Sequence, residues 1–278
     1  MIATSFRIIG LLVAGAASGL IGALLGLGGG IFLIPALVLG FGVPMHSAVA
    51  AGLVAIIATS STGGARNAQL GLANVRLGMV LETTTVLGAL AGGLLAQSLS
   101  ARRLGLLFAT LQLAVSVTLW LRRRGCEAHE YRASGGLLDG AYHDRAARRD
   151  VSYSVRRLPA ALAASLGAGV LSSLLGVGGG VVKVPALHLF CGVPMKAATA
   201  TSNLMIGVTA AASAVIYLTA GAVPAVVAAT VCLGVLAGSQ VGLWFSHRLS
   251  ERMTARMFAI VTFAISCLMF RRFLHAAP

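Results

Sequence analysis

The sequence predicts an all-α, polytopic membrane protein, and three observations lead to this fold class. Of its 278 residues, 58% are hydrophobic and only 10% are charged, with a mean hydropathy of +0.92. The apolar residues gather in long runs, and the polar residues gather between those runs. A soluble protein of this size keeps many more polar residues for its exterior. We therefore expect the lipid bilayer to be the solvent of most side chains.

The apolar runs give the expected helices in chain order. A run of about 18 or more apolar residues is long enough to cross a bilayer. About eight such runs occur, near residues 7–27, 31–63, 77–97, 104–121, 159–175, 181–218, 222–245 and 254–270. The second and sixth are too long for one helix and carry glycine and proline inside them, so we expect both to be broken.

The charge of the chain is strongly positive, with a formal net charge of +14 at pH 7. In a soluble domain this excess would suggest a nucleic-acid partner. Here the basic residues lie mostly between apolar runs, where they set membrane topology and contact anionic lipids. We expect no nucleic-acid partner. The four cysteines have no metal-ligand spacing and are interpreted as packing residues, so we expect neither a metal nor another cofactor.

The chain repeats itself at an offset of 150 residues. GLGGGIFLIPAL (26–37) aligns with GVGGGVVKVPAL (176–187), and the GVPM that follows each copy aligns as well. The match slips by four residues where LGALAG (87–92) meets LGVLAG (233–238). The sequence thus predicts two related halves, each with four apolar segments.

We expect a first membrane repeat at 1–121, an arginine-rich hydrophilic linker at 122–158 and a second membrane repeat at 159–278. The linker should be solvated, and its excess of arginine favours the cytoplasmic side. Positive charge also flanks other segments, so charge alone leaves the topology open. Four full crossings per half would make the repeats parallel, whereas a segment that dips in and returns would make them inverted.

The doubled glycine motif is the first candidate site. Three glycines followed by a proline five residues after the last of them favour a helix break, at Gly28 to Gly30 and again at Gly178 to Gly180. Non-helical backbone is tolerated in a membrane only inside protein or beside a wet cavity. Broken helices at matching points of two repeats indicate a transport site, because helix N-termini offer donors to an anion. Close helix packing by small residues is the alternative.

Two charged residues lie within apolar runs. Lys183 should face the interior, either as a cationic contact for an anion or as a structurally paired lysine. Glu82 is the acid within a membrane segment, so it is the expected partner of Lys183 or a proton-coupling group. The sequence leaves both alternatives open.

The second break, GVPMK (192–196), begins a helix whose first turns carry Thr199, Ser202 and Asn203. These side chains can cap the helix or contact an oxyanion. Capping is the simpler interpretation for Thr199, and we favour a substrate role for Ser202 and Asn203. The equivalent stretch of the first half, 49–53, lacks such groups.

The paired motifs, the stretch GVPMKAATATSNLMIGVTAAASA (192–214), the segment around Glu82 and the duplication resemble the TauE/SafE family of sulfite exporters, also called the 4-toluene sulfonate uptake permease family. The resemblance covers nearly the whole chain outside the linker. It implies a multi-pass carrier in the inner membrane of a bacterium or archaeon. It also implies a small sulfur-containing anion as substrate, such as sulfite, sulfoacetate, thiosulfate or an organosulfonate, and the proton gradient as driving force. Leu33, which stands opposite Lys183, departs from a symmetric site.

We therefore expect a secondary transporter that is not an enzyme, with its site near the two GxGGG breaks. An anion channel is one alternative, and a structural or sensor subunit without transport is another. An intramembrane enzyme is disfavoured, because the sequence has neither paired acids nor a nucleophile set at membrane depth. The direction of transport stays open, as does the oligomeric state, a homo-oligomer included.

Overall fold

The computed structural model describes residues 2–25, 28–121, 136–144, 149–245 and 251–275. Gly26 of the first motif and much of the linker lie outside them. The elements are α1 (Ile2–Leu25), α2 (Gly30–Pro35), the π-helical turn η1 (Ala36–Gly40), α3 (Met45–Gln69), α4 (Val75–Ser98), α5 (Ala101–Leu121), β1 (Gly140–Asp144), β2 (Arg149–Tyr153), α6 (Leu158–Leu175), α7 (Gly180–Leu189), α8 (Met195–Thr219), α9 (Ala225–Phe245) and α10 (Glu251–His275). The all-α membrane class predicted from the sequence is confirmed.

Six helices in the described ranges are long and apolar enough to cross a membrane: α1, α3, α4, α6, α8 and α9. The two overlong apolar runs are each split, as predicted. The first gives α2 with η1 and then α3, and the second gives α7 and then α8. The splits follow Gly40 and Leu189, where Pro44 and Pro194 become the N-caps of α3 and α8.

The first part of each split run forms a hairpin with the helix before it. The chain therefore returns to the end of the bundle from which that helix started. The chain turns back after α1, so that Arg7 Nη2 lies 3.5 Å from the carbonyl oxygen of Phe41. In the second half, α7 returns beside the start of α6, and the Arg156 N–H donates to the Cys191 carbonyl at 3.2 Å. Neither α2 with η1 nor α7 crosses the bundle. Both are re-entrant.

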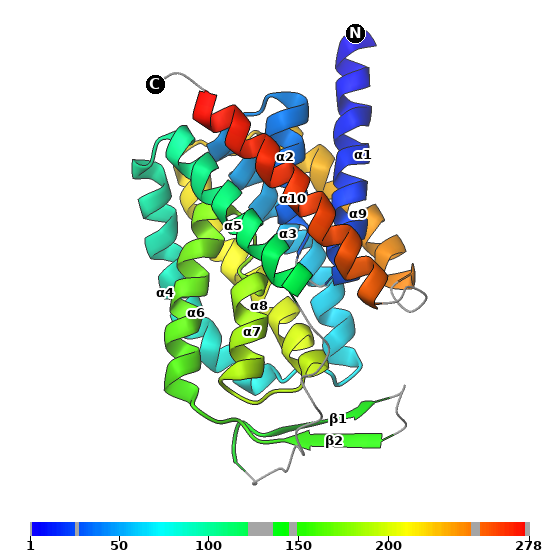
Figure 1. Ribbon diagram of the computed structural model, residues 1–278, viewed down its shortest axis with the longest axis vertical. Coiled ribbons are helices and arrows are strands. Elements are labelled where there is room, and N and C mark those ends of the chain that lie inside the picture. Colours follow the sequence, from blue (N-terminus) through cyan, green and yellow to red (C-terminus); the bar gives the residue numbers. More distant parts are fainter. Residues whose placement is uncertain (1, 26–27, 122–135, 145–148, 246–250, 276–278) are drawn as a thin grey trace.

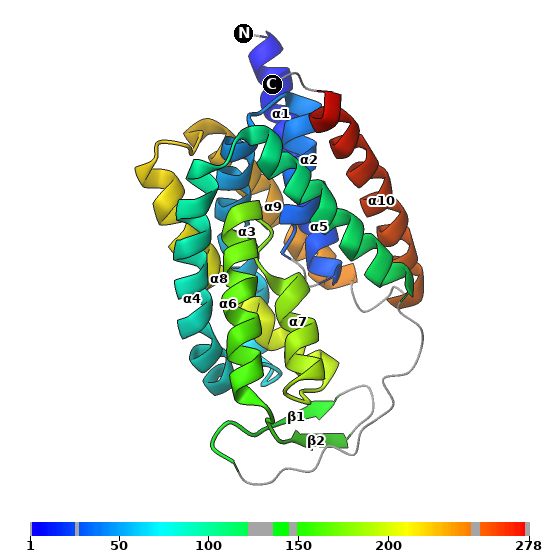
Figure 2. The same cartoon turned by 60° about the vertical axis from the view of Figure 1, so that its left-hand side comes forward.

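The two hairpins enter from opposite ends of the bundle (Figures 1 and 2). The first enters at the end that holds both termini, which we call the terminal end. There His46 Nε2 lies 3.1 Å from the carbonyl oxygen of Leu99 at the end of α4. The second enters at the end covered by β1 and β2, which we call the linker end. The repeats are therefore inverted, which answers the question that charge left open.

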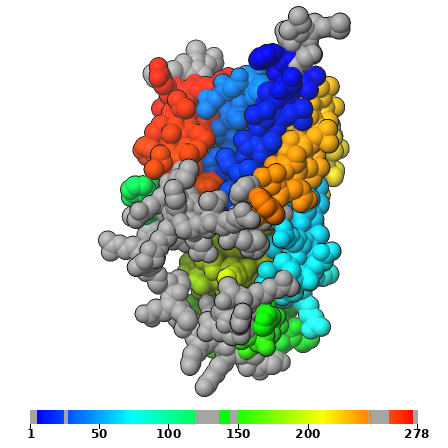
Figure 3. Space-filling view, turned by 90° about the vertical axis from the view of Figure 1, so that its right-hand side faces the viewer, coloured from blue at the N-terminus to red at the C-terminus, as the bar shows by residue number. Residues whose placement is uncertain are grey.

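Each hairpin packs against a helix of the other half. α1 runs parallel to α9, and a Cβ atom at Gly15 or Gly19 would collide with the carbonyl oxygens of Val231 and Val235. In the same way, Gly88 and Gly92 of α4 lie against the backbone of α6. Figure 3 shows α1 and α9 side by side on one face. Glycine packing explains these positions, because it lets the backbones approach closely.

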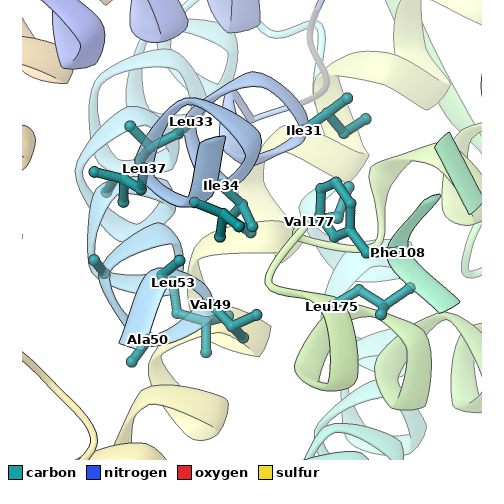
Figure 4. Packing of buried hydrophobic residues seen from close by; sticks show 14 of the residues in the cluster. Ile31, Leu33, Ile34, Leu37, Val49, Ala50, Leu53, Phe108, Leu175 and Val177 are labelled. Carbon is teal, nitrogen blue, oxygen red and sulfur yellow. The ribbon is translucent and has the colours of Figure 1, made fainter. Parts of the chain in front are cut away.

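The apolar core lies around the first hairpin (Figure 4). Leu33, Ile34 and Leu37 are completely buried against Val49 and Leu53 of α3. Leu33 occupies the position that Lys183 has in the second half, so this part of the first repeat is ordinary apolar packing. The halves share a backbone plan and differ in chemistry.

The linker is more structured than the solvated segment we expected. β1 and β2 form an antiparallel pair, and Tyr142 and Tyr153 are buried against residues of α4, α6 and α7. Asn74, at the start of α4, donates from Nδ2 to the Leu138 carbonyl at 2.9 Å. Burial raises the pKa of the Tyr153 phenol, which favours its neutral form. The strands therefore form a cap on the linker end.

Candidate functional site

The GGG motifs form the tips of the two re-entrant hairpins. Gly28 and Gly29 have φ angles of 82° and 70°, and Gly178 and Gly179 have 81° and 70°. Residues with a side chain rarely adopt these angles, so each tip requires glycine. Gly29 caps α2 and Gly179 caps α7, both without a side-chain hydrogen bond. The positive ends of both short helices thus lie inside the protein.

The tips meet each other in the middle of the bundle. A Cβ atom at Gly30 would collide with the carbonyl oxygen of Gly176. Gly28 and Gly178 both border the side chains of Ile56 and Ile206, which lie at positions 150 residues apart. The two tips are thus packed directly on one another between α3 and α8.

A small pocket lies beside the first tip. Its volume is about 30 Å³, more than the roughly 10–15 Å³ that one water molecule requires. Its lining comes from α1, the first tip, α3, α8 and α9, and it includes Gly28, Thr59, Ser60, Asn203 and Ser239. Two of the predicted site residues, Gly28 and Asn203, therefore meet in one pocket.

The polar groups of this pocket differ in how they are bonded. The hydroxyls of Ser60, Thr59 and Ser239 donate to the backbone carbonyls of Asn203, Ile56 and Leu236 respectively.

The Asn203 side-chain amide has no hydrogen-bond partner in the part of the chain that the structure describes. No acidic residue is among the described residues that line the pocket. The amide is thus available to a ligand, and no described side chain of the lining carries a negative charge.

Lys183 and Glu82 lie in a separate buried network. Lys183 Nζ is 3.1 Å from Glu82 Oε2 and 2.7 Å from Thr209 Oγ1, and the Thr209 hydroxyl donates to Glu82 Oε1. Lys183 is 1% exposed and Glu82 is 8% exposed. The pairing that the sequence offered as one alternative is present, with α4, α7 and α8 each supplying one member. Neither charged residue lines the pocket.

The other predicted site residues are scattered. Gly29, Gly30, Gly179 and Gly180 belong to the tips. Thr199 does not cap α8, because the N-cap is Pro194 and no side-chain bond is made there. It is half-buried and lies outside the pocket lining. Ser202 is completely buried, and its hydroxyl has no partner in the described parts of the chain.

Several polar residues of the site escaped the sequence analysis. Thr209 completes the charged network, and Thr59, Ser60 and Ser239 line the pocket. The repeat contained a signal for two of them, because an offset of 150 places Thr59 on Thr209. Serine and threonine are common in membrane helices, so composition alone would not have selected them. Within the described residues, no group of three or more His, Cys, Asp or Glu side chains could hold a metal ion.

Comparison with known proteins places this architecture in a family. Residues 11–269 match the family described as "Sulfite exporter TauE/SafE". A curated relative, "Probable membrane transporter protein YunE" of Bacillus subtilis (strain 168), is 24% identical over 264 residues, which are 92% of this chain and 95% of the relative. No solved structure matches the chain. The multi-pass architecture and the match over nearly the whole length agree, and the chain belongs to the sulfite exporter TauE/SafE family of membrane transporters.

Proposed function

We propose that the protein is a secondary transporter of small sulfur-containing anions, such as sulfite, sulfoacetate, thiosulfate or an organosulfonate. The observation that carries this proposal is the meeting of two re-entrant helix tips beside a small pocket. Among the described residues, its lining includes several hydroxyls and the Asn203 amide and no acidic side chain. The Asn203 amide supplies a donor, and the N-terminus of the ten-residue α7, at the tip packed against the first, favours negative charge. A sulfur oxyanion is larger than one water molecule, so its entry requires the pocket to widen.

The pocket lies toward the linker end of the tips. Its α3 residues, Thr59 to Gly63, are in the half of α3 that runs toward Asn74 and the linker cap. Asn203 lies in the half of α8 that begins at this same end, where Thr201 Oγ1 accepts from the Asn74 N–H. The linker arginines favour the cytoplasmic side. The conformation described is therefore best interpreted as facing the cytoplasm, in the inner membrane of a bacterial or archaeal cell.

The charged network supplies a coupling mechanism. Lys183 neutralises Glu82 in the absence of substrate. Lys183 lies outside the pocket, so in this mechanism the anion reaches it only after moving beyond the pocket. When the anion then pairs with Lys183, Glu82 is left buried without a cation, which costs about 3–5 kcal/mol. A proton on Glu82 removes that cost. The anion and the proton therefore bind cooperatively in this mechanism, whatever the direction of net transport.

The test is anion flux in proteoliposomes, measured with sulfite and with thiosulfate, with and without a pH gradient. Saturable flux that responds to the gradient is expected. Asn203→Ala should raise the KM about tenfold, which corresponds to the loss of one hydrogen bond to a charged ligand. Glu82→Gln should abolish the response to the gradient. Thr110→Ala, on the exposed face of α5, is the control and should behave like the unaltered protein.

Two outcomes would contradict the proposal. Flux that never saturates and ignores the pH gradient would indicate an anion channel. No flux of either anion would remove the substrate class and favour a structural or sensor subunit.

A further inference from the structure

Two serine hydroxyls near the second tip are buried without a partner. Ser172 is 1% exposed and Ser173 is 0% exposed, and in the described residues neither Oγ atom has a hydrogen-bond partner. Leaving a buried hydroxyl unpaired costs about 1–3 kcal/mol. Such groups in a native protein require an explanation, and an absent ion or water is a common one.

Both serines lie where α7 begins. They are in the last turn of α6, directly before the second glycine break. A Cβ atom at Gly179, the N-cap of α7, would be 3.3 Å from Ser172 Cβ, and a Cβ atom at Gly93 would be 2.9 Å from Ser173 Oγ. Gly179 receives no side-chain cap. The Ser172 side chain thus lies at the positive end of a ten-residue helix, and the Ser173 hydroxyl, on the next residue of α6, lies beside α4.

The internal repeat relates this region to the pocket. The pocket lining includes Gly22, Ala23, Gly28, Thr59 and Gly63. At the offset of 150, these positions correspond to Ser172, Ser173, Gly178, Thr209 and Ser213. The two serines are therefore the counterparts of residues that already line a pocket.

The counterpart region lies on the other side of the tips. Thr209 and Ser213 are in the half of α8 that runs toward the terminal end, where the Gln97 amide of α4 donates to the Ile216 carbonyl at 3.2 Å. The pocket described above lies toward the linker end. In an inverted repeat, exchanging the conformations of the halves opens the counterpart and closes the original.

We propose that Ser172 and Ser173 line a second oxyanion-binding site, which the transporter presents to the face opposite the linker. The inference rests on the proposed function and deepens it. The two hydroxyls and the N-terminus of α7 donate to oxyanion oxygens in that state. Thr209 borders the same site and joins it to Lys183 and Glu82. The site near the linker has glycine and alanine at the positions of the serines, so the two faces recognise the anion with different groups.

The experiment measures thiosulfate transport from each face. Right-side-out and inside-out membrane vesicles present opposite faces, and trypsin cleavage of the arginine-rich linker identifies which face is which. In Ser172→Ala/Ser173→Ala, the KM should rise tenfold or more on the face opposite the linker and stay within twofold on the linker face. Asn203→Ala, with its side chain in the other pocket, should show the reverse pattern.

The same variants also provide the control for folding. Because the hydroxyls lack partners, the double alanine variant should unfold in anion-free buffer at the same temperature as the unaltered protein or higher. Unchanged KM values on both faces, or an equal rise on both, would overturn the second site while leaving transport intact. Absence of saturable flux in the unaltered protein would instead overturn the proposed function, and the second site with it.

Discussion

At the scale of single residues, Lys183 is the position where the two halves differ most. It forms a buried ion pair with Glu82, whereas Leu33 at the matching place is part of the apolar core. A buried ion pair contributes little net stability, because desolvation offsets the attraction, but removing one partner is costly. The pair is therefore sensitive to single substitutions and tolerant of matched ones.

We predict that Lys183→Met lowers the free energy of unfolding by about 3–5 kcal/mol, since it leaves Glu82 buried without its cation. Lys183→Met/Glu82→Gln should recover most of that loss. Chemical unfolding in detergent micelles measures both. Lys196→Met, which removes an exposed lysine at the start of α8, is the matched control and should change stability by less than about 1 kcal/mol. A single variant as stable as the unaltered protein would mean that Glu82 does not depend on Lys183.

Some residues of the candidate site could be predicted from the sequence, and others could not. Lys183 and Glu82 were foreseeable as partners because membrane segments contain few charges. Asn203 was foreseeable because it follows a proline break. Ser172 and Ser173 were not, because a serine in an apolar helix usually bonds its own backbone. Only the three-dimensional packing shows that these two do not.

At the scale of elements, the tips show why the breaks contain glycine. The sequence predicted the breaks from composition, and the structure adds the reasons. Gly28 and Gly29 need left-handed backbone angles, whereas Gly30 has an ordinary angle but lies against the Gly176 carbonyl. Transport use and packing are therefore not exclusive explanations, because the packing of the tips is what places the helix ends at the centre.

We predict that Gly30→Ala destabilises the protein by about 1–3 kcal/mol, because the new methyl group collides with the Gly176 carbonyl and the Ile56 side chain. Gly167→Ala is the matched control. Gly167 lies within α6 with open space around it, so alanine there should be neutral or stabilising by up to about 1 kcal/mol. Thermal unfolding of the two variants makes the comparison. Equal effects would show that the tips are not tightly packed.

The cap that β1 and β2 form on the linker end was not predicted from composition. Arginine dominates residues 122–157, which predicted a solvated segment. Two aromatic side chains, Tyr142 and Tyr153, are enough to fix a short strand pair on the bundle. Two buried residues in a polar stretch give too few matches to any strand pattern for hydropathy to predict the strands.

At the scale of the whole molecule, the inverted arrangement follows from the two hairpins. Counting apolar runs gave about eight segments, and charge could not decide which of them cross. The structure decides because α2 with η1 and α7 return to the ends from which they started. Hydropathy measures length and polarity, and it does not distinguish a segment that crosses from one that turns back.

We predict that cysteines at Gly40 and Phe190 react from opposite faces of the membrane. Both positions are exposed, and they are equivalent at the offset of 150 residues. Single-cysteine variants in a background without the natural cysteines, treated with a membrane-impermeant thiol reagent on intact cells and on inside-out vesicles, make the test. Labelling of both from one face would contradict the inverted topology.

The packing of α1 against a helix of the other half also affects the order in which contacts can form during synthesis. α1 leaves the ribosome before α9, because the backbone of α9 that packs on Gly15 and Gly19 follows more than 200 residues later. At a synthesis rate of about 5–20 residues per second, α1 waits roughly 10 to 40 seconds for its neighbour. α4 and α6 are much closer along the chain, so their contact can form while α9 is still unmade. α1 is thus enclosed long after it is synthesised, and a nascent chain released before α9 would leave the glycine face of α1 open to lipid.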